Sequence, residues 1–207
     1  MEFVTLTVGQ MQANCYIIVE NEQRKCLIVD AGEDADYIET IIRSKGLLPQ
    51  AILATHGHFD HLMAVLQLQL NFNIPFMIHE NDVFLVKNMR ESARHFLRID
   101  AGPSPIINSY LDKEREINLG SLSLKVIETP GHTPGSVCLY SKKEGFILCG
   151  DLIFAGGSVG RTDFSYSNKL KLEKSVKQIF RYPLDTVLHP GHGPKTRIKD
   201  EIGYYTL

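Results

Sequence analysis

The sequence predicts an α/β fold in which two packed, mixed β-sheets carry helices on their outer faces. Three observations favour it: short apolar runs bounded by turn residues outnumber helical patterns, most of these runs form local hairpins, and helices lie between them. The chain has 207 residues, of which 43% are hydrophobic and 22% charged, so one domain over residues 1–207 is expected. This composition excludes a disordered or coiled-coil protein.

Strands and helices are expected to alternate in the first part of the chain. Strands are predicted at residues 3–8, 15–19, 26–29, 51–54 and 76–78. Residues 36–45 are predicted to form a helix, because apolar side chains recur on one face and Gly46 ends the pattern. A second helix is expected from about Asp60 to Asn71.

The same alternation continues in the second part. Strands are predicted at residues 123–127, 137–140, 146–148 and 186–188, with a helix over 169–181. Between the two parts, residues 80–112 interrupt the alternation of strands and helices. They show a long helical pattern and a loop that contains Gly102 and two prolines. We expect this segment to form a lid or a wall at the edge of the domain.

Charge and hydropathy argue against several partners and locations. The formal net charge of −2 offers no strong field for nucleic acid or an anionic membrane, so neither is expected as a partner. Residues 1–11 lack the features of a signal peptide, and the longest apolar run, 62–70, falls short of the ~20 residues of a membrane span. The four cysteines lie in or beside apolar segments and are expected to be buried, reduced thiols. We therefore predict a cytoplasmic protein.

The hexapeptide at residues 56–61 is dense in metal-ligand side chains. Three histidines and one aspartate in this order would occur by chance in roughly 6 of 10,000 chains of this composition. Further ligand-type residues follow the ends of three later strands, and loops at strand ends can converge on one point. The seven candidate ligands are His56, His58, Asp60, His61, His132, Asp151 and His192.

Seven ligands exceed what one tetrahedral ion can use, and they suit two divalent ions that share a carboxylate. Zinc is expected, although iron or manganese accepts the same ligands. Coordination lowers the pKa of water from 15.7 to about 7, so a metal-bound hydroxide is the expected nucleophile of a hydrolase. Two ions, two carboxylates and one hydroxide leave a net positive charge, which favours a small anionic substrate.

These motifs resemble those of the metallo-β-lactamase superfamily. The similarity lies in residues 55–61, 130–136, 150–151 and 190–193, and it extends over residues 14–193. It implies an αββα sandwich, in agreement with the layers predicted above. It also implies that His56, His58 and His132 hold one ion, that Asp60, His61 and His192 hold the other, and that Asp151 bridges them.

Within that superfamily the chain resembles the short, single-domain glyoxalase II proteins, which are hydroxyacylglutathione hydrolase-like. The similarity lies in residues 9–16, 29–32, 150–156 and 160–164. It implies hydrolysis of a thioester such as S-D-lactoylglutathione. From the chemistry of the metal-bound hydroxide, Asp60 is expected to be the proton acceptor as well as a ligand. The longer glyoxalase II enzymes contact glutathione through a carboxy-terminal helical domain, whereas here only residues 193–207 follow His192. The thiol half of the substrate therefore stays open.

Basic side chains that could replace the missing glutathione contacts are Arg161 and the regularly spaced Arg90, Arg94 and Arg98. Of the other histidines, His79 and His95 are expected to be structural, and His189 is a candidate for support of a ligand. Alternative functions are a mono-iron persulfide dioxygenase and a lactonase or other ester hydrolase of the same fold. A nuclease is disfavoured because no basic stripe is present, and an inactive scaffold because no ligand is missing.

Overall fold

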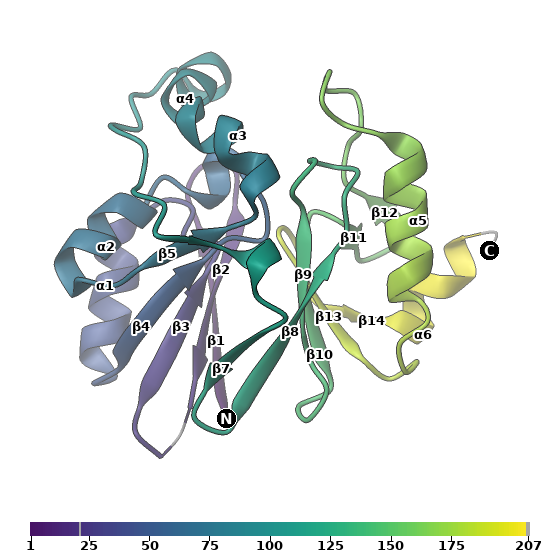
Figure 1. The fold of residues 1–207 in the computed structure, drawn as a ribbon, viewed down its shortest axis with the longest axis horizontal. Coiled ribbons are helices and arrows are strands. Elements are labelled where there is room, and N and C mark those ends of the chain that lie inside the picture. Colours follow the sequence, from purple (N-terminus) through teal and green to yellow (C-terminus); the bar gives the residue numbers. More distant parts are fainter. Residues whose placement is uncertain (21, 206–207) are drawn as a thin grey trace.

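The computed structural model describes residues 1–20 and 22–205 and consists of two six-stranded sheets packed face to face (Figure 1). The first sheet has the strand order β1-β2-β3-β4-β5-β6, and the second has the order β14-β13-β10-β9-β8-β7. Helices α1 (Ala35–Ser44) and α2 (Val65–Phe72) cover the outer face of the first sheet, and α5 (Lys169–Ile179) covers that of the second. The predicted αββα sandwich is confirmed.

Each sheet mixes parallel and antiparallel strand pairs. The strands of the first sheet are β1 (Glu2–Val8), β2 (Ala13–Val19), β3 (Lys25–Val29), β4 (Leu48–Leu53), β5 (Phe76–Ile78) and β6 (Ser109–Tyr110). Those of the second are β7 (Glu116–Leu119), β8 (Leu122–Glu128), β9 (Val137–Ser141), β10 (Phe146–Gly150), β13 (Val187–Pro190) and β14 (Thr196–Arg197). A separate hairpin joins β11 (Ile153–Phe154) to β12 (Ser158–Val159).

The core is continuous from one outer layer to the other because the central strands are buried on both faces. Alternate residues of β2 point to opposite sides of the sheet, so Ile17 packs under the helices and Ile18 packs between the sheets. Between the sheets, Leu53 of β4 belongs to the same buried cluster as Leu139 and Leu148 of the second sheet. A strand buried on one face only would show an alternating burial pattern, which β2 lacks.

The helix predicted from Asp60 starts later than expected. Residues Phe59–His61 form one turn of 3-10 helix, and the α-helix begins at Val65. The backbone N–H of Ala64 donates to the carbonyl oxygens of Ala31 and Gly32, at 3.1 and 2.9 Å. This tether to the loop after β3 interrupts the helical hydrogen bonds and leaves Asp60 and His61 on a tight turn.

Residues 80–112 do not form one long helix. The segment contains two short helices, α3 (Val83–Lys87) and α4 (Met89–Leu97), and its end forms β6, which extends the first sheet beside β5. The parallel pairing of Met77 with Ser109 gives no local signal, because the partner lies far along the chain. Strands β6, β7, β11, β12 and β14 and the short helix α6 (Ile198–Glu201) were likewise not predicted.

Among the described residues, every helix is too short or too polar to cross a lipid bilayer. All four cysteines are buried and unpaired in this part of the chain, as expected. Burial raises the pKa of Cys26 and Cys138 to about 12, so these thiols stay protonated at neutral pH.

Candidate metal centre

The predicted ligands lie on loops that follow the carboxyl ends of strands in both sheets. Residues 56–61 follow β4 of the first sheet. His132 follows β8, Asp151 follows β10 and His192 follows β13 of the second sheet. Because β8, β10 and β13 run in one direction, their ends meet at one edge of the sandwich.

The structure brings all seven predicted ligands together in two groups. Within each group, one possible ligand atom per residue lies within 4.8 Å of the others. The first group consists of His56, His58, His132 and Asp151, and the second of Asp60, His61 and His192. The six ligands other than Asp151 are divided as the sequence resemblance implies, and Asp151, which the resemblance makes a bridge, falls in the first group.

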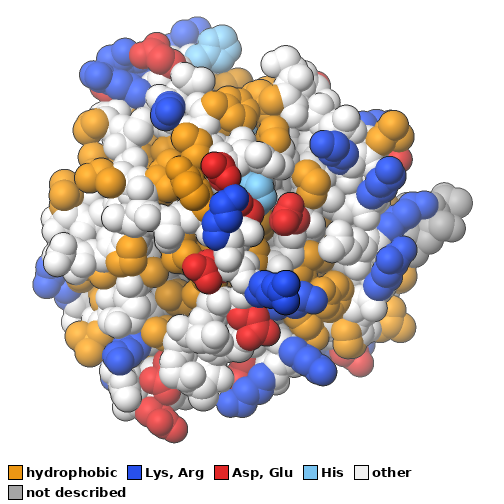
Figure 2. Space-filling view, in the orientation of Figure 1, with side chains coloured by type: hydrophobic (Ala, Val, Ile, Leu, Met, Phe, Trp, Pro, Cys, Tyr) orange, Lys and Arg blue, Asp and Glu red, His pale blue; other side chains and the backbone are white. Residues whose placement is uncertain are grey.

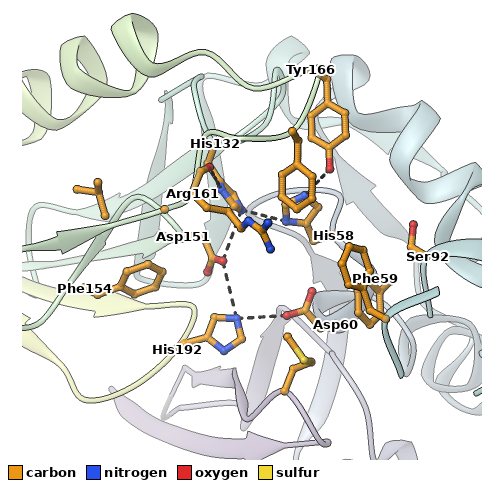
Figure 3. A pocket seen from close by; sticks show the side chains of 15 residues that line it. His58, Phe59, Asp60, Ser92, His132, Asp151, Phe154, Arg161, Tyr166 and His192 are labelled. Carbon is orange, nitrogen blue, oxygen red and sulfur yellow. Dashed lines mark hydrogen bonds and ion pairs between the residues drawn. The ribbon is translucent and has the colours of Figure 1, made fainter. Parts of the chain in front are cut away.

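Asp151 lies between the two groups. Its Oδ2 atom is 3.5 Å from Nε2 of His132 in the first group and 3.8 Å from Nε2 of His192 in the second (Figure 3). Nε2 of His192 is also 3.2 Å from Oδ2 of Asp60. One carboxylate therefore faces both groups, which is the arrangement that a bridging ligand requires.

The histidines of the first group present lone pairs to a common point. Nδ1 of His132 donates to the carbonyl oxygen of Arg161 at 2.8 Å, so in the neutral ring Nε2 carries no hydrogen. That Nε2 atom lies 2.9 Å from Nδ1 of His58. Burial, together with the neighbouring His132, lowers the pKa of His58 to about 3. Neutral imidazoles are the form that binds divalent metals.

Two buried polar atoms of the first group also fit a metal site. Nε2 of His56 and Oδ1 of Asp151 have no hydrogen-bond partner among the described residues. An unpaired buried polar atom is costly, and a divalent ion would satisfy both. The nitrogen and oxygen donor set suits zinc, iron or manganese.

The second group is surrounded by carboxylates. Nδ1 of His61 is 3.3 Å from Oδ2 of Asp30, and its Nε2 is 3.6 Å from Oδ1 of Asp151. Burial alone would lower the pKa of His61, but Asp60, Asp30 and Asp151 raise it to about 10. Burial alone would raise the pKa of Asp60, and the charges of His61 and His192 hold it below its usual range instead.

Asp30 supports both groups, and it was not among the predicted site residues. Its carboxylate accepts hydrogen bonds from the backbone N–H and the hydroxyl of Thr55, at 2.7 and 2.8 Å, besides facing His61. The Thr55 oxygen lies 3.1 Å from Nδ1 of His56 and accepts its hydrogen, because the hydroxyl hydrogen is used on Asp30. The sequence position of Asp30 could have indicated this role, because Asp30 follows the end of an apolar strand, as Asp151 does.

Asp82 holds two ligand loops together and was also missed. Its buried carboxylate accepts hydrogen bonds from the N–H of Gly57 at 2.8 Å, the hydroxyl of Thr133 at 2.6 Å and the N–H of Gly135 at 2.7 Å. Burial raises the pKa of Asp82 despite these donors. Nothing local in the sequence distinguishes Asp82 from a surface aspartate, because its partners lie in loops remote along the chain.

The loop that carries His192 takes its position from the first sheet. The backbone N–H of Asn14 donates to the carbonyl oxygen of Gly191 at 2.7 Å. The Asn14 amide donates to the carbonyl oxygens of Pro190 and Gly193, at 3.0 and 2.8 Å. The hydroxyl of Tyr16 adds a hydrogen bond of 2.6 Å to Pro190. Strand β2 thus fixes a ligand loop that belongs to the second sheet.

A cavity of about 320 Å³ opens beside the two groups. His58, Asp60, His132, Asp151 and His192 line its floor. Aromatic and aliphatic side chains, among them Phe59 and Phe154, form its walls (Figure 3). Helix α4 contributes Ser92 and Phe96. Such a cavity, mostly apolar with a few convergent polar groups, is typical of a small-molecule site.

Arg161 also lines this cavity, but its charge is already paired. Its guanidinium donates two hydrogen bonds to the carboxylate of Asp163, at 2.7 and 2.6 Å. The same guanidinium lies over the ring of Phe164, 4.4 Å from the centroid. A role of Arg161 in substrate binding therefore stays a prediction.

The other candidate side chains lie outside the cavity. Arg90 and Arg94 pair with Asp100 at 2.6 and 3.0 Å on the exposed face of α4. Arg98, at the end of α4, is exposed. More generally, acidic and basic side chains are mixed over the face seen in Figure 2.

Three histidines were not assigned as ligands. The ring of His189 stacks on Phe3 at 4.3 Å in a second cavity, so it packs against aromatic rings rather than against a ligand. Burial lowers the pKa of His189 to about 4. His79 accepts a hydrogen bond from the N–H of Asn81, which is a structural role, and His95 lies exposed on α4.

The fold and the ligand set define a metal-dependent hydrolase. Residues 8–192 match the profile of the Metallo-beta-lactamase superfamily, and the chain belongs to this superfamily. Its relatives include a probable metallo-hydrolase, YqgX, from Bacillus subtilis, which is 35% identical over 97% of this chain and 94% of the relative. Hydroxyacylglutathione hydrolase GloC from Haemophilus influenzae is 31% identical over 97% of this chain and 95% of the relative.

Solved structures agree with this assignment. The BLEG-1 B3 metallo-beta-lactamase superposes with a TM-score of 0.88 at 31% identity, covering 98% of this chain and 97% of that one. TTHA1623 in a di-iron-bound form superposes with a TM-score of 0.85 at 31% identity, covering 95% of both chains. Both neighbours share the fold over nearly the whole length of the described protein.

Proposed function

We propose that this protein hydrolyses thioesters at a centre of two divalent metal ions. One observation carries the proposal: the carboxylate of Asp151 faces two complete groups of ligands at the floor of one cavity. Bound divalent ions would supply a nucleophilic hydroxide near neutral pH and would polarise a carbonyl oxygen. A thiolate leaves readily, so the site needs no strong general acid.

The chain supplies the remaining functions. Asp60 lines the cavity and is ionised at neutral pH, so its carboxylate can accept a proton during attack. His132 is held by the carbonyl oxygen of Arg161, and His58 by the hydroxyl of Tyr166 at 2.9 Å, so both rings keep one orientation. The apolar walls beside these groups offer surface against which a substrate can pack.

The choice of thioesters rests on the resemblance to glyoxalase II-like proteins and on the relative that is named a hydroxyacylglutathione hydrolase. S-D-lactoylglutathione is the first substrate to test. Arg161 lines the cavity and would bind an anionic group of the substrate once its ion pair with Asp163 is broken. The cytoplasmic location, the absence of a nucleic-acid partner and the lid at residues 80–112 remain predictions from the sequence.

Zinc is the proposed metal, with iron as the alternative that a di-iron-bound neighbour favours. The test is metal analysis of the purified protein beside a thioester panel, before and after chelation and reloading with zinc, iron or manganese. We expect about two ions per chain, turnover of S-D-lactoylglutathione, loss on chelation and recovery on reloading. Failure of every fully loaded form to hydrolyse any thioester in the panel would contradict the proposal.

The main alternative is a mono-iron persulfide dioxygenase. The completeness of the second group, Asp60, His61 and His192, favours two ions over one. Oxygen consumption with glutathione persulfide by a protein that holds one iron would reverse the choice. A lactonase or another ester hydrolase would reveal itself by acid release from lactones or simple esters in the same panel.

A further inference from the structure

Four aromatic rings form a continuous surface along one side of the cavity. Phe59 and Phe96 stack with centroids 5.8 Å apart and an interplanar angle of 5°. Phe164 and Tyr166 stack with centroids 5.2 Å apart and an angle of 11°. Phe96 meets Phe164 edge to face, at 6.5 Å and 89°, and so joins the two pairs. We name these four residues the aromatic wall.

The aromatic wall begins at the metal centre. The ring centroid of Phe164 lies 5.2 Å from that of His58. The Tyr166 hydroxyl contacts the same histidine (Figure 3). All four wall residues line the cavity whose floor carries the ligands. A group bound against the wall would therefore be part of the molecule that reacts.

Three of the four wall residues expose part of their rings. Phe96 is 48% exposed, Phe164 and Tyr166 are half-buried, and Phe59 is buried behind Phe96. Exposed aromatic surface next to a polar site is typical of a ligand-binding face. Rings arranged in stacked and edge-to-face pairs prefer another planar ring over an aliphatic chain of equal size.

Charge supports the same interpretation. Among the described residues that line the cavity, Arg161 is the one lysine or arginine, and it is paired with Asp163. Arg90 and Arg94, which could have drawn a multiply charged thiol toward α4, are paired with Asp100. The part of the cavity remote from the ligands is therefore better suited to an apolar group than to a highly charged one.

We propose that the aromatic wall binds a planar apolar group of the substrate, so that the protein prefers thioesters that carry an aryl ring. This inference rests on the proposed thioesterase activity and adds the substrate class. The wall lies beside the metal centre, and either half of a thioester can reach it. The ring can therefore belong to the acyl half or to the thiol half.

The test compares matched thioesters with and without a ring. In the acyl arm, phenylacetyl-glutathione is compared with acetyl-glutathione. In the thiol arm, the lactoyl thioester of benzyl mercaptan is compared with that of methyl mercaptan. Burial of a phenyl ring against the wall is expected to raise kcat/KM by roughly 10- to 100-fold in one arm. The arm that responds identifies which half of the substrate faces the wall.

Variants connect this preference to the wall. Phe96→Ala and Phe164→Ala are each expected to reduce the ratio of kcat/KM between ring-bearing and ring-free substrates by about 5- to 10-fold. Phe96→Leu keeps apolar volume and removes the ring, so it separates stacking from simple burial. Tyr37→Ala on α1 is the matched control, because Tyr37 is also 48% exposed but lies outside the cavity.

A binding measurement keeps the inference testable without turnover. Calorimetry compares S-benzylglutathione with S-methylglutathione, neither of which can be hydrolysed, and phenylacetate with acetate. Tighter binding of the ring-bearing member of one pair, weakened by Phe96→Ala, would support the aromatic wall even if no thioester were cleaved. Equal binding within both pairs and equal kcat/KM within both arms would overturn the inference, whereas thioester hydrolysis without ring preference would leave the proposed function intact.

Discussion

The two groups of ligands are supported in different ways. In the first group, the outer ring nitrogens face neutral groups: the hydroxyls of Thr55 and Tyr166 and the carbonyl oxygen of Arg161. In the second group, His61 faces the carboxylate of Asp30, which is 1% exposed. A carboxylate partner makes an imidazole more basic, and so a stronger ligand for a metal ion, than a neutral partner does.

The difference shows that one buried carboxylate, that of Asp30, is connected to both ligand groups. The first group distributes its support over three outer partners, so loss of one should be local. In the second group, His61 faces Asp30, and Asp30 also reaches the first group through Thr55. The groups are therefore distinct in their ligands but share one support, and substitutions can separate these two properties.

The largest effect is expected from Asp151→Ala, which removes the carboxylate that both groups face. Activity should fall by more than about 100-fold, beyond the range for loss of a ligand's outer partner. Metal analysis should find one ion or fewer per chain. His192→Ala is the matched control, because it should lose the ion of the second group and retain that of the first. Loss of both ions in His192→Ala would show that the groups do not load independently.

Asp30→Asn should come next, with activity or metal affinity reduced roughly 10- to 100-fold. The free energy of unfolding should fall by about 3 kcal/mol, because a buried charged hydrogen-bond network is broken. Asparagine tolerates the left-handed backbone of Asp30, where φ is 56°, so the change tests charge rather than strain. Denaturant titration and metal analysis measure the two effects. Thr55→Val should disturb the first group only, and an equal effect on both ions would contradict the proposed division of support.

Tyr166→Phe should have a smaller effect, at most about 10-fold in activity. The substitution removes the hydroxyl that faces His58 and keeps the ring in the aromatic wall. Water can replace the hydroxyl because Tyr166 is only half-buried. Steady-state kinetics at saturating metal would measure the effect, and a loss as large as that of Asp30→Asn would remove the distinction between neutral and charged support.

The smallest effect is expected from Asp100→Asn, which breaks exposed ion pairs on α4. Tm should fall by at most about 3 °C, and the metal content should not change. The Arg90 guanidinium holds the pKa of Asp100 well below its usual range, so the pairs contribute at neutral pH. The difference in Tm between the two proteins should shrink as the pH falls through that lowered pKa. A difference that grows on acidification would contradict this account.

The sandwich and the gathering of the seven candidate ligands follow from the sequence, because both leave local signals. Buried strands are apolar runs, and ligands follow their ends in short motifs, as His132 and His192 do. In contrast, Asp82 and β6 depend on partners far along the chain, so their roles follow from packing that no short window records.

The aromatic wall was missed for a similar reason. Phe96 comes from a segment that was expected to form a long peripheral helix, and Phe164 comes from a loop singled out for Arg161. Their contact across 6.5 Å exists only in the folded protein. The helix expected from Asp60 was displaced to Val65 because the bonds from Ala64 to Ala31 and Gly32 outweigh the local helical pattern.

The hydrogen bonds from Asn14 and Tyr16 to the loop that carries His192 join the first sheet to the second, and this matters for how the metal centre forms. Each ligand group draws residues from both sheets, so a fragment that ends before β7 contains no complete group, and neither does the remainder. Coordination therefore becomes possible only after the amino-terminal and carboxy-terminal halves have docked. If the chain were split at the turn before β7, recovery of metal uptake on mixing would report directly on how tightly the halves recognise each other.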